Sequence, residues 1–313
     1  MEQPPAPPHR QSIAVVGLGG IGGGAAGFLA STGRYDITAC LRQPVDRLVL
    51  EYPEGVIEVP LRAMTDPALA TPVDWVILAT KTHDTASAGL WLKRLCNSAT
   101  TVVALQNGID HVERIAPYAN GATIVPALVY YNGERLAPDR VRVTWINREE
   151  LVVPDDAGGR AFAALLAGTP LRVQLSNDFV TLKWRKLLLN AIANPIPALT
   201  LQRFAVFQRD DIGELSLAIL DEAIHVARAD GAKLADDEAA RVLAMLRGFS
   251  PDLGSSMYFD RLAGKPFEVE ALTGAIVAAG QRYGIATPLN GTLLTLLRAI
   301  SEENAKAQSK TQA

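Results

Sequence analysis

The fold is decided close to the N-terminus, where residues 13–22 read Ile-Ala-Val-Val-Gly-Leu-Gly-Gly-Ile-Gly. The apolar, β-branched run predicts a buried strand, and the glycines after it match the pattern GxGxxG. In such a unit the first glycine permits a tight turn, the second lets the backbone approach a pyrophosphate, and the third lets helix and strand pack closely. The helix predicted next would direct its free N–H groups at that anion. A glycine-rich turn without a ligand is the weaker alternative to a dinucleotide-binding loop made by Gly17, Leu18, Gly19, Gly20, Ile21 and Gly22.

Short apolar runs and helical stretches continue to alternate through the first half of the chain. Strands are predicted at residues 12–17, 36–41, 75–80, 101–105 and 123–127, with helices at 21–30, 84–95 and 109–116. This alternation predicts a mostly parallel sheet with helices on its faces. Two further strands, at 140–145 and 150–153, follow a Tyr-Asn-Gly turn at 131–133 and would form an antiparallel extension.

The second half changes character after a last strand at 171–175. Apolar residues recur at helical spacing over 179–193, 212–229, 236–246, 268–283 and 289–300. We therefore expect an α/β fold with a Rossmann-type N-terminal sheet and a mainly α-helical C-terminal domain. The expected organisation is a flexible tail at 1–11, a dinucleotide-binding domain at 12–175, a helical substrate and catalytic domain at 176–301, and a polar tail at 302–313.

Composition excludes several classes of function. The 313 residues carry a net charge of −3 without a basic block, which argues against nucleic acid or an anionic membrane as partner. No uncharged apolar stretch reaches the roughly 20 residues of a membrane span. Cys40 and Cys96 form no CxxC pair, so a reducing compartment, the cytoplasm, is expected. The histidines at 9, 83, 111 and 225 lack metal-ligand spacing, and no metal is predicted.

The residue after the second strand selects the dinucleotide. NAD-binding folds usually place Asp or Glu there to bind the ribose hydroxyls. Here the strand ends in Arg42, and Asp36 stands at its other end. A guanidinium suits the 2′-phosphate of NADP, which it can bind through two hydrogen bonds. Arg42 therefore favours NADP(H) over NAD, with a solvated surface arginine as the alternative.

A polar stripe marks the helix predicted at 179–193. Lys186, Asn190 and Asn194 are spaced i, i+4 and i+8, so they fall along one face, among apolar neighbours. Burying an ammonium and two amides is unfavourable unless polar groups meet them, and a substrate with carboxylate and carbonyl oxygens would do so. The alternative is that the asparagines bond to nearby backbone, with Asn194 ending the helix before Pro195.

Taken together, these residues resemble the ketopantoate reductase family over about residues 12–300. The resemblance depends most on the Arg-Lys-Leu-x-x-Asn-x-x-x-Asn-Pro segment and on a Ser-Ser-Met segment. The matching features, in chain order, are the glycine loop, Arg42, Ala79-Thr80-Lys81, Gln106-Asn107-Gly108, Trp184-Arg185-Lys186-Leu187, Asn190, Asn194-Pro195, Ser255-Ser256-Met257 and Glu268.

The resemblance implies that NADPH reduces a 2-oxo acid, by default 2-dehydropantoate, to a 2-hydroxy acid. It implies Lys186 as the general acid, a role that suits a lysine whose pKa is lowered by a desolvated cleft. Asn107 would touch cofactor and substrate, and Glu268 would sit where nicotinamide and substrate meet. It further implies cofactor contacts from Lys81 and the backbone near Val129, and substrate contacts from Asn190, Asn194 and Ser256.

Each implied role has a structural alternative. Lys186 could be a snorkelling surface lysine, and Lys81 a solvated loop lysine. Asn107 could belong to an Asn-Gly turn, and Ser256 could cap a helix. Glu268 could be an acid in the first turn of a helix, where the dipole favours negative charge.

Two departures from the family pattern leave the substrate open. Leu253 stands where a polar residue is expected, and Phe204 lies where a smaller or more polar one is usual. The same chemistry on a bulkier or more apolar 2-oxo acid is therefore one alternative. A non-catalytic NADP-binding regulatory protein is another, although it would need only the glycine loop and Arg42. The apolar C-terminal helices leave a homodimer open.

Overall fold

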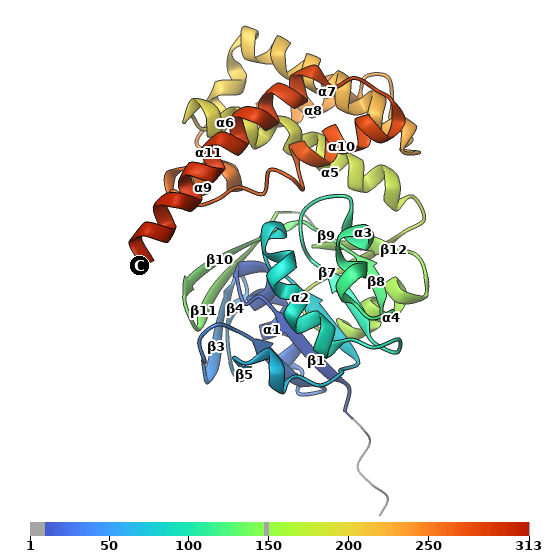
Figure 1. Ribbon diagram of the computed structural model, residues 1–313, viewed down its shortest axis with the longest axis vertical. Helices are drawn as coiled ribbons and strands as arrows, with labels where there is room; N and C mark the ends of the chain where they lie inside the picture. Colours follow the sequence, from blue (N-terminus) through green and yellow to red (C-terminus); the bar gives the residue numbers. More distant parts are fainter. Residues whose placement is uncertain (1–9, 147–149, 313) are drawn as a thin grey trace, which may run out of the picture. The chain divides into compact units, whose positions relative to one another are not determined.

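A computed structural model of the protein describes residues 10–146 and 150–312 (Figure 1). Residues 1–9 of the predicted N-terminal tail lie outside this part. The chain forms two compact units. The first comprises the residues up to Gln106 and those from His111 to Asn177, and the second comprises Asn107–Asp110 and the residues from Asp178 onward. The short segment Asn107–Asp110 is thus grouped with the helical half of the chain.

A six-stranded parallel sheet organises the first unit, in the order β5-β2-β1-β6-β7-β8. The five predicted strands are present, and β5 adds an edge that the sequence did not indicate. Side chains of β1 alternate between two hydrophobic clusters: Ile13 and Val15 belong to one, Ala14 and Val16 to the other. Burial on both faces explains the continuous apolar runs. The bounds are β1 Ser12–Val16, β2 Asp36–Cys40, β5 Arg62–Met64, β6 Trp75–Leu78, β7 Thr101–Ala104 and β8 Thr123–Pro126.

Helices cover both faces of this sheet. Phe28 of α1 (Gly20–Ser31) packs into the first cluster, and Leu92 of α2 (Thr85–Leu95) packs into the second. The helix predicted at 109–116 is shorter, α3 (His111–Ile115), and continues as a 3₁₀ turn, η3 (Ala116–Tyr118). Helix α4 (Ala157–Leu165), which the sequence did not predict, adds Phe162 to the first cluster.

Two smaller sheets complete the first unit, and they correct two predictions. The strands predicted at 140–145 and 150–153 do not form one antiparallel extension: β11 pairs antiparallel with β10 and parallel with β3, whereas β12 lies in the other sheet, antiparallel to β9 and parallel to β13. The predicted Tyr-Asn-Gly turn at 131–133 is wrong, because these residues begin strand β10, which pairs antiparallel with β11. The glycine serves a close approach instead: a Cβ on Gly133 would lie 2.3 Å from the carbonyl carbon of Gly20. Tyr131 donates its hydroxyl hydrogen to Ile21 O at 2.7 Å, so β10 holds the start of α1. The sheets are β10-β11-β3-β4 and β13-β12-β9, with bounds β3 Arg47–Tyr52, β4 Gly55–Pro60, β9 Leu128–Val129, β10 Tyr131–Ala137, β11 Arg140–Trp145, β12 Leu151–Pro154 and β13 Val173–Ser176.

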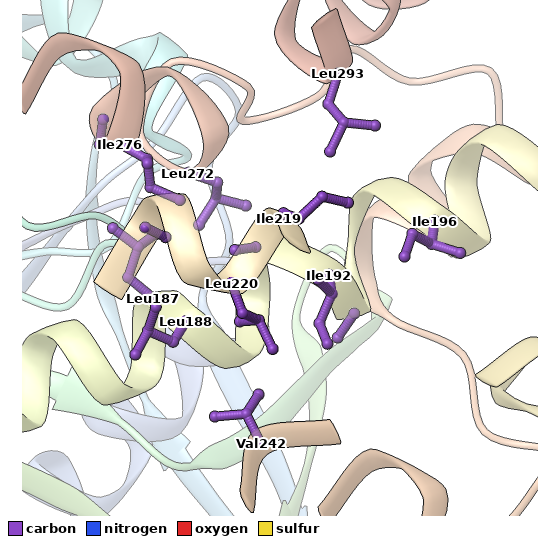
Figure 2. Close-up of a cluster of buried hydrophobic side chains, with 14 of the residues drawn as sticks. Leu187, Leu188, Ile192, Ile196, Ile219, Leu220, Val242, Leu272, Ile276 and Leu293 are labelled. Carbon is purple, nitrogen blue, oxygen red and sulfur yellow. The ribbon is translucent and has the colours of Figure 1, made fainter. Parts of the chain in front are cut away.

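The second unit is helical and has one large hydrophobic core. Leu187, Leu188 and Ile192 of α5 lie among Ile219 and Leu220 of α7 in this core (Figure 2). These helices match the predicted ones because their apolar spacing continues over many turns. The elements are α5 Phe179–Ala193, α6 Pro195–Thr200, η4 Phe204–Gln208, α7 Asp210–Ala229, α8 Glu238–Arg247, α9 Ser256–Leu262, α10 Thr273–Tyr283 and α11 Pro288–Gln312.

Two boundaries in this unit differ from the sequence prediction. Helix α10 begins at Thr273, so Glu268 lies in the loop before it and not in a first helical turn. Helix α11 continues to Gln312, where a polar tail was predicted from residue 302. The extension has tertiary support, because Asn304 is buried and its side-chain amide donates to Lys265 O at 2.9 Å. The polar composition of this segment predicted a tail because it gives no indication of this contact.

Candidate active site

The glycine loop joins β1 to α1 and leaves backbone N–H groups available for a ligand. Gly17 has φ +98°, and a Cβ there would lie 2.7 Å from Thr80 N, so only glycine fits. Gly22 brings the helix close to β6, since a Cβ would lie 2.9 Å from that of Ala79. Gly19 differs, because a Cβ there would meet no protein atom within 4 Å. Helix α1 also has no side-chain cap and no acid in its first turn. The loop thus keeps open space beside uncapped N–H groups, which fits a pyrophosphate.

Further candidates of the first unit follow neighbouring strands. Arg42 comes just after β2, and Lys81 precedes the 3₁₀ turn η2 (Thr82–Asp84) that follows β6. The Arg42 side chain is 89% exposed and lies 3.9 Å from the carboxylate of Asp84. An exposed pair of this kind is weak, so the guanidinium remains able to meet a phosphate. Val129 ends β9, where it pairs with Leu151 of β12.

Gln106 is a buried residue of this region whose importance the sequence did not reveal. Its amide nitrogen donates to the carbonyl and the hydroxyl of Thr80, each at 3.0 Å, and its amide oxygen accepts from Arg114 at 3.3 Å. Gln106 therefore fixes the peptide of Thr80, against which Gly17 packs. Its occurrence in the Gln-Asn-Gly motif was the only signal, and that motif indicated Asn107 instead.

The predicted polar stripe lies on α5 in the second unit. Lys186 and Asn190 are partly exposed, whereas Asn194, which ends the helix, is buried. Apolar residues on the remaining face of α5 belong to the core of Figure 2. The stripe is therefore the polar side of a helix whose other side is anchored in that core.

Asn194 contacts the start of α9. Its amide oxygen accepts from the backbone N–H of Met257 at 3.4 Å and lies 3.5 Å from the hydroxyl of Ser256. Ser255, not Ser256, caps α9, because its hydroxyl accepts from Tyr258 N at 3.2 Å. The hydroxyl of Ser256 is exposed and is brought to the end of the stripe. Asn194 therefore bonds to backbone, as the structural alternative predicted, and it also lies beside the hydroxyl of Ser256.

Lys186, Glu268 and Asn107 form an interacting group from three separate parts of the sequence. Glu268 is buried and accepts from the side-chain amide of Asn107 at 3.2 Å. Gly108, with φ +105°, makes the bend that follows Asn107. Burial lowers the pKa of Lys186 to about 8, while the negative charge of Glu268 acts in the opposite direction. Although its side chain keeps some solvent contact, enough protein surrounds it to disfavour the ammonium. Lys186 can thus lose and regain a proton near neutral pH.

The two departures from the family pattern have different surroundings. Phe204 is buried in the core and stacks on Phe249, with a ring-centroid distance of 5.7 Å to Phe207. The side chain of Leu253 is 48% exposed, in the turn before α9. The backbones meet, because Phe204 N donates to Leu253 O at 2.9 Å. Phe204 is therefore a packing residue, whereas the side chain of Leu253 faces solvent.

No group of three or more His, Cys, Asp or Glu side chains suited to a metal ion occurs within 10–146 and 150–312. Among the helices of these same residues, none combines the length and apolar character needed to cross a membrane.

Comparison with known proteins matches both halves of the chain. Residues 13–155 match the family described as "Ketopantoate reductase PanE/ApbA", and residues 178–301 match "Ketopantoate reductase PanE/ApbA C terminal". A 2-dehydropantoate 2-reductase of Caulobacter vibrioides is 39% identical over 291 residues, which cover 92% of this chain and 98% of that protein.

Solved structures agree. A PanE/ApbA family ketopantoate reductase from Ralstonia eutropha superposes with a TM-score of 0.84 at 28% identity, covering 94% of this chain and 99% of that one. A ketopantoate reductase of Staphylococcus aureus, described as dimeric, gives a TM-score of 0.82 at 25% identity, with the same coverage.

Proposed function

The chain belongs to the ketopantoate reductase family, and we propose that it reduces 2-dehydropantoate to pantoate with NADPH. The observation that carries the chemistry is Lys186, whose pKa is lowered to about 8 beside the buried carboxylate of Glu268. A ketone reduction needs a hydride and a proton, and a lysine of this pKa can supply the proton near neutral pH.

The first unit fits NADPH, which when bound supplies the hydride. Gly17–Gly22 would hold the pyrophosphate on the N-terminus of α1, where Gly19 leaves open space. Arg42 would bind the 2′-phosphate, since its guanidinium is exposed and only weakly paired. We propose that Lys81 and the backbone at Val129 line the same cofactor, as the family resemblance implies.

The second unit would hold the substrate and its proton donor. Lys186 would give its proton to the oxygen that becomes the hydroxyl, and its charge would stabilise the negative charge growing there. Asn190, Asn194 and Ser256 would bind the remaining oxygens of the 2-oxo acid. Within the described residues, the side-chain amide nitrogen of Asn194 has no protein partner, because its contacts use the amide oxygen.

Glu268 and Asn107 would keep this donor charged and oriented. Burial alone would strip Lys186 of its proton at still lower pH, and the carboxylate of Glu268 opposes this. The hydrogen bond from Asn107 holds that carboxylate in place. We propose that both also contact the nicotinamide or the substrate, as the resemblance implies.

Reduction assays with a panel of acids test the function. NADPH oxidation is measured with 2-dehydropantoate and with an unbranched, a branched and an aromatic 2-oxo acid. The highest kcat/KM is expected for 2-dehydropantoate. A preference for the aromatic acid would instead favour the alternative substrate, for which the exposed Leu253 is the specific observation. NADPH binding without turnover of any acid would overturn the proposal and favour a regulatory protein.

The proton donor has its own test. Lys186→Ala is expected to lower kcat by about 10²- to 10⁴-fold without changing the Kd for NADPH. Lys306→Ala, at an exposed lysine of α11, is the control and should behave like the wild type. Normal turnover by Lys186→Ala would remove this residue as the acid.

We also propose a cytoplasmic homodimer. The solved Staphylococcus aureus relative is described as dimeric. Both cysteines are free and buried, as suits a reducing compartment. Light scattering on the purified protein should give twice the chain mass of 33.5 kDa.

A further inference from the structure

Two carboxylates hold the part of α5 that immediately precedes Lys186: Asp230, which begins the connection between α7 and α8 (residues 230–237), and Glu238, the first residue of α8. Asp230 Oδ2 accepts from Trp184 Nε1 at 2.8 Å and lies 3.2 Å from the ammonium of Lys183. Glu238 Oε1 accepts from Arg185 Nε at 2.9 Å, with a longer second contact of 3.4 Å. Three successive residues of α5 are thus bonded to Asp230 and Glu238, which stand at the two ends of the α7–α8 connection, and we call these two carboxylates the α5 clamp.

The carboxylates of the clamp are sheltered from solvent, although the side chain of Arg185 is 45% exposed. Trp184 is fully buried, and the side chains of Asp230 and Glu238 are only 12% and 6% exposed. Burial alone would raise the pKa of Asp230, but hydrogen bonds from Tyr283 and Trp184 and the charge of Lys183 bring it below its ordinary value. Asp230 is therefore charged at neutral pH, and its bonds resemble buried charge-assisted contacts more than exposed surface pairs.

The clamp is itself held rigid. Arg228 donates to Ala235 O at 3.0 Å and to Leu234 O at 3.3 Å, which closes the connection on the end of α7. Lys233 N donates at 2.8 Å to the hydroxyl of the buried residue Thr181, which precedes Lys183 by two residues on α5. A flexible loop would follow α5 if the helix moved, whereas this connection resists such movement.

The spacing of the gripped residues prevents rotation of the helix. Successive residues of an α-helix are separated by about 100° around its axis. Bonds at Lys183, Trp184 and Arg185 therefore hold α5 from directions spread over about 200°, so the helix cannot roll without breaking at least one. The next residue in this series is Lys186, whose direction is fixed by the same rotation.

We propose that Asp230 and Glu238 are positioning residues, which fix the rotation of α5 and thereby the direction of the Lys186 ammonium relative to Glu268. The catalytic consequence rests on the proposed function, in which Lys186 is the proton donor. Proton transfer requires donor and acceptor within hydrogen-bond reach. A displacement of about 1 Å can lower the rate about 10²-fold.

Matched variants separate positioning from simple stabilisation. Asp230→Asn/Glu238→Gln removes both clamp charges while keeping side-chain shape. Asp237→Asn is the control, because it removes a charge of the same connection whose partner, Arg241, lies on α8 and not on α5. The single variants Asp230→Asn and Glu238→Gln replace the double variant if that protein does not fold.

Two measurements are made on each folded variant. The first is kcat for NADPH-dependent reduction, together with the Kd for NADPH. The second is the pKa of Lys186, obtained by mass spectrometry from the pH dependence of its acylation in the protein without substrate. This second measurement does not require catalysis. A lysine whose role is unaffected by the clamp would keep its pKa even in a less stable protein.

The double variant is expected to lose about 10- to 100-fold in kcat with an unchanged Kd for NADPH. Its Lys186 pKa should rise from about 8 toward 10.5 as the side chain regains water. Asp237→Asn should match the wild type in both. A lowered melting temperature with kcat and pKa unchanged would overturn the clamp. If the wild type reduces no acid, the proposed function fails, and the Lys186 pKa alone then decides the clamp.

Discussion

Lys186 should make the protein less stable at neutral pH, and its replacement by methionine should therefore stabilise the fold. Burial lowers the pKa of this lysine from 10.5 to about 8. The difference of about 2.5 pH units corresponds to about 3 kcal/mol of unfavourable free energy for the ammonium in the folded state. Because the side chain keeps some solvent contact, a gain of about 1–3 kcal/mol is expected for Lys186→Met at pH 7.

The stability of the wild type should increase as the pH rises through the pKa of Lys186. Between pH 8 and 10.5 the unfolded chain keeps the proton of Lys186 while the folded chain has released it, so the wild type gains stability as the pH rises. Below pH 8 the lysine is charged in both states, and its full destabilising effect is present. The advantage of Lys186→Met over the wild type should therefore be largest at pH 7 and should shrink toward pH 10.

Urea unfolding at pH 7 and pH 9.5 measures the effect. Circular dichroism follows the whole chain. Fluorescence follows the second unit in a background where Trp75, Trp91 and Trp145 of the first unit are replaced by phenylalanine, because Trp184 is then the only tryptophan. Comparing variants at each pH cancels the contributions of Cys40 and Cys96, whose pKa values burial raises to about 12 and about 11. Lys306→Met, at an exposed lysine, should give no gain.

Two results would refute the reasoning. The first is a methionine variant that is no more stable than the wild type at pH 7. The second is a stability difference that does not change with pH, because the gain would then come from apolar burial by methionine and not from removal of a desolvated charge. Loss of reductase activity together with a gain in stability would be the combination expected for a functional group held at a cost to the fold.

Three further predictions concern cofactor binding and the pH profile. Arg42→Ala should raise the KM for NADPH by about 10- to 100-fold and leave that for NADH nearly unchanged, and equal effects on the two would contradict the 2′-phosphate assignment. Gly19→Ala should weaken NADPH binding but leave the thermal stability of the cofactor-free protein unchanged. Gly20→Ala should destabilise the cofactor-free protein by about 1–3 kcal/mol, because its Cβ would lie 2.0 Å from the backbone of β10. Calorimetry measures both effects, and normal NADPH binding by Gly19→Ala would exclude the proposed pyrophosphate contact. The kcat/KM for reduction should fall as the pH rises through about 8, where Lys186 loses its proton, because burial lowers its pKa to that value. Glu268→Gln should move this fall to lower pH, since the negative charge that raises the pKa of Lys186 is removed; an unmoved profile would contradict the interaction.

The sequence predicted the parallel sheet and the long helices because the spacing of apolar residues along the chain indicates which of them are buried. Residues 13–16 are apolar without interruption, as a strand buried on both faces requires, and α5 keeps helical spacing from end to end. The hairpin of β3 and β4 carried no such signal. Leu48 and Leu50 are buried because they meet Phe28 of α1 in the same cluster, and that contact is tertiary.

Some residues of the candidate site were likewise predictable from local sequence, and others were not. The stripe of Lys186, Asn190 and Asn194 was visible because all three lie on one helix. The loop position of Glu268 was not, since the apolar spacing of α10 appears to local inspection to begin there, although the helix starts at Thr273. Asp230 gave only a turn signal before glycine. Its function as an acceptor for Trp184 depends on a partner 46 positions away in the chain.

The cost of burying Lys186 and the existence of the α5 clamp follow from one physical requirement. A lysine side chain is long and flexible, and it can usually move its ammonium into water when burial is unfavourable. About 1–3 kcal/mol would favour such a movement here, and a small rotation of α5 would assist it. The carboxylates of Asp230 and Glu238 oppose that rotation through the residues directly before Lys186. A lowered pKa can therefore persist only where the helix is restrained, so the variants that release α5 should also be those in which Lys186 recovers an ordinary pKa.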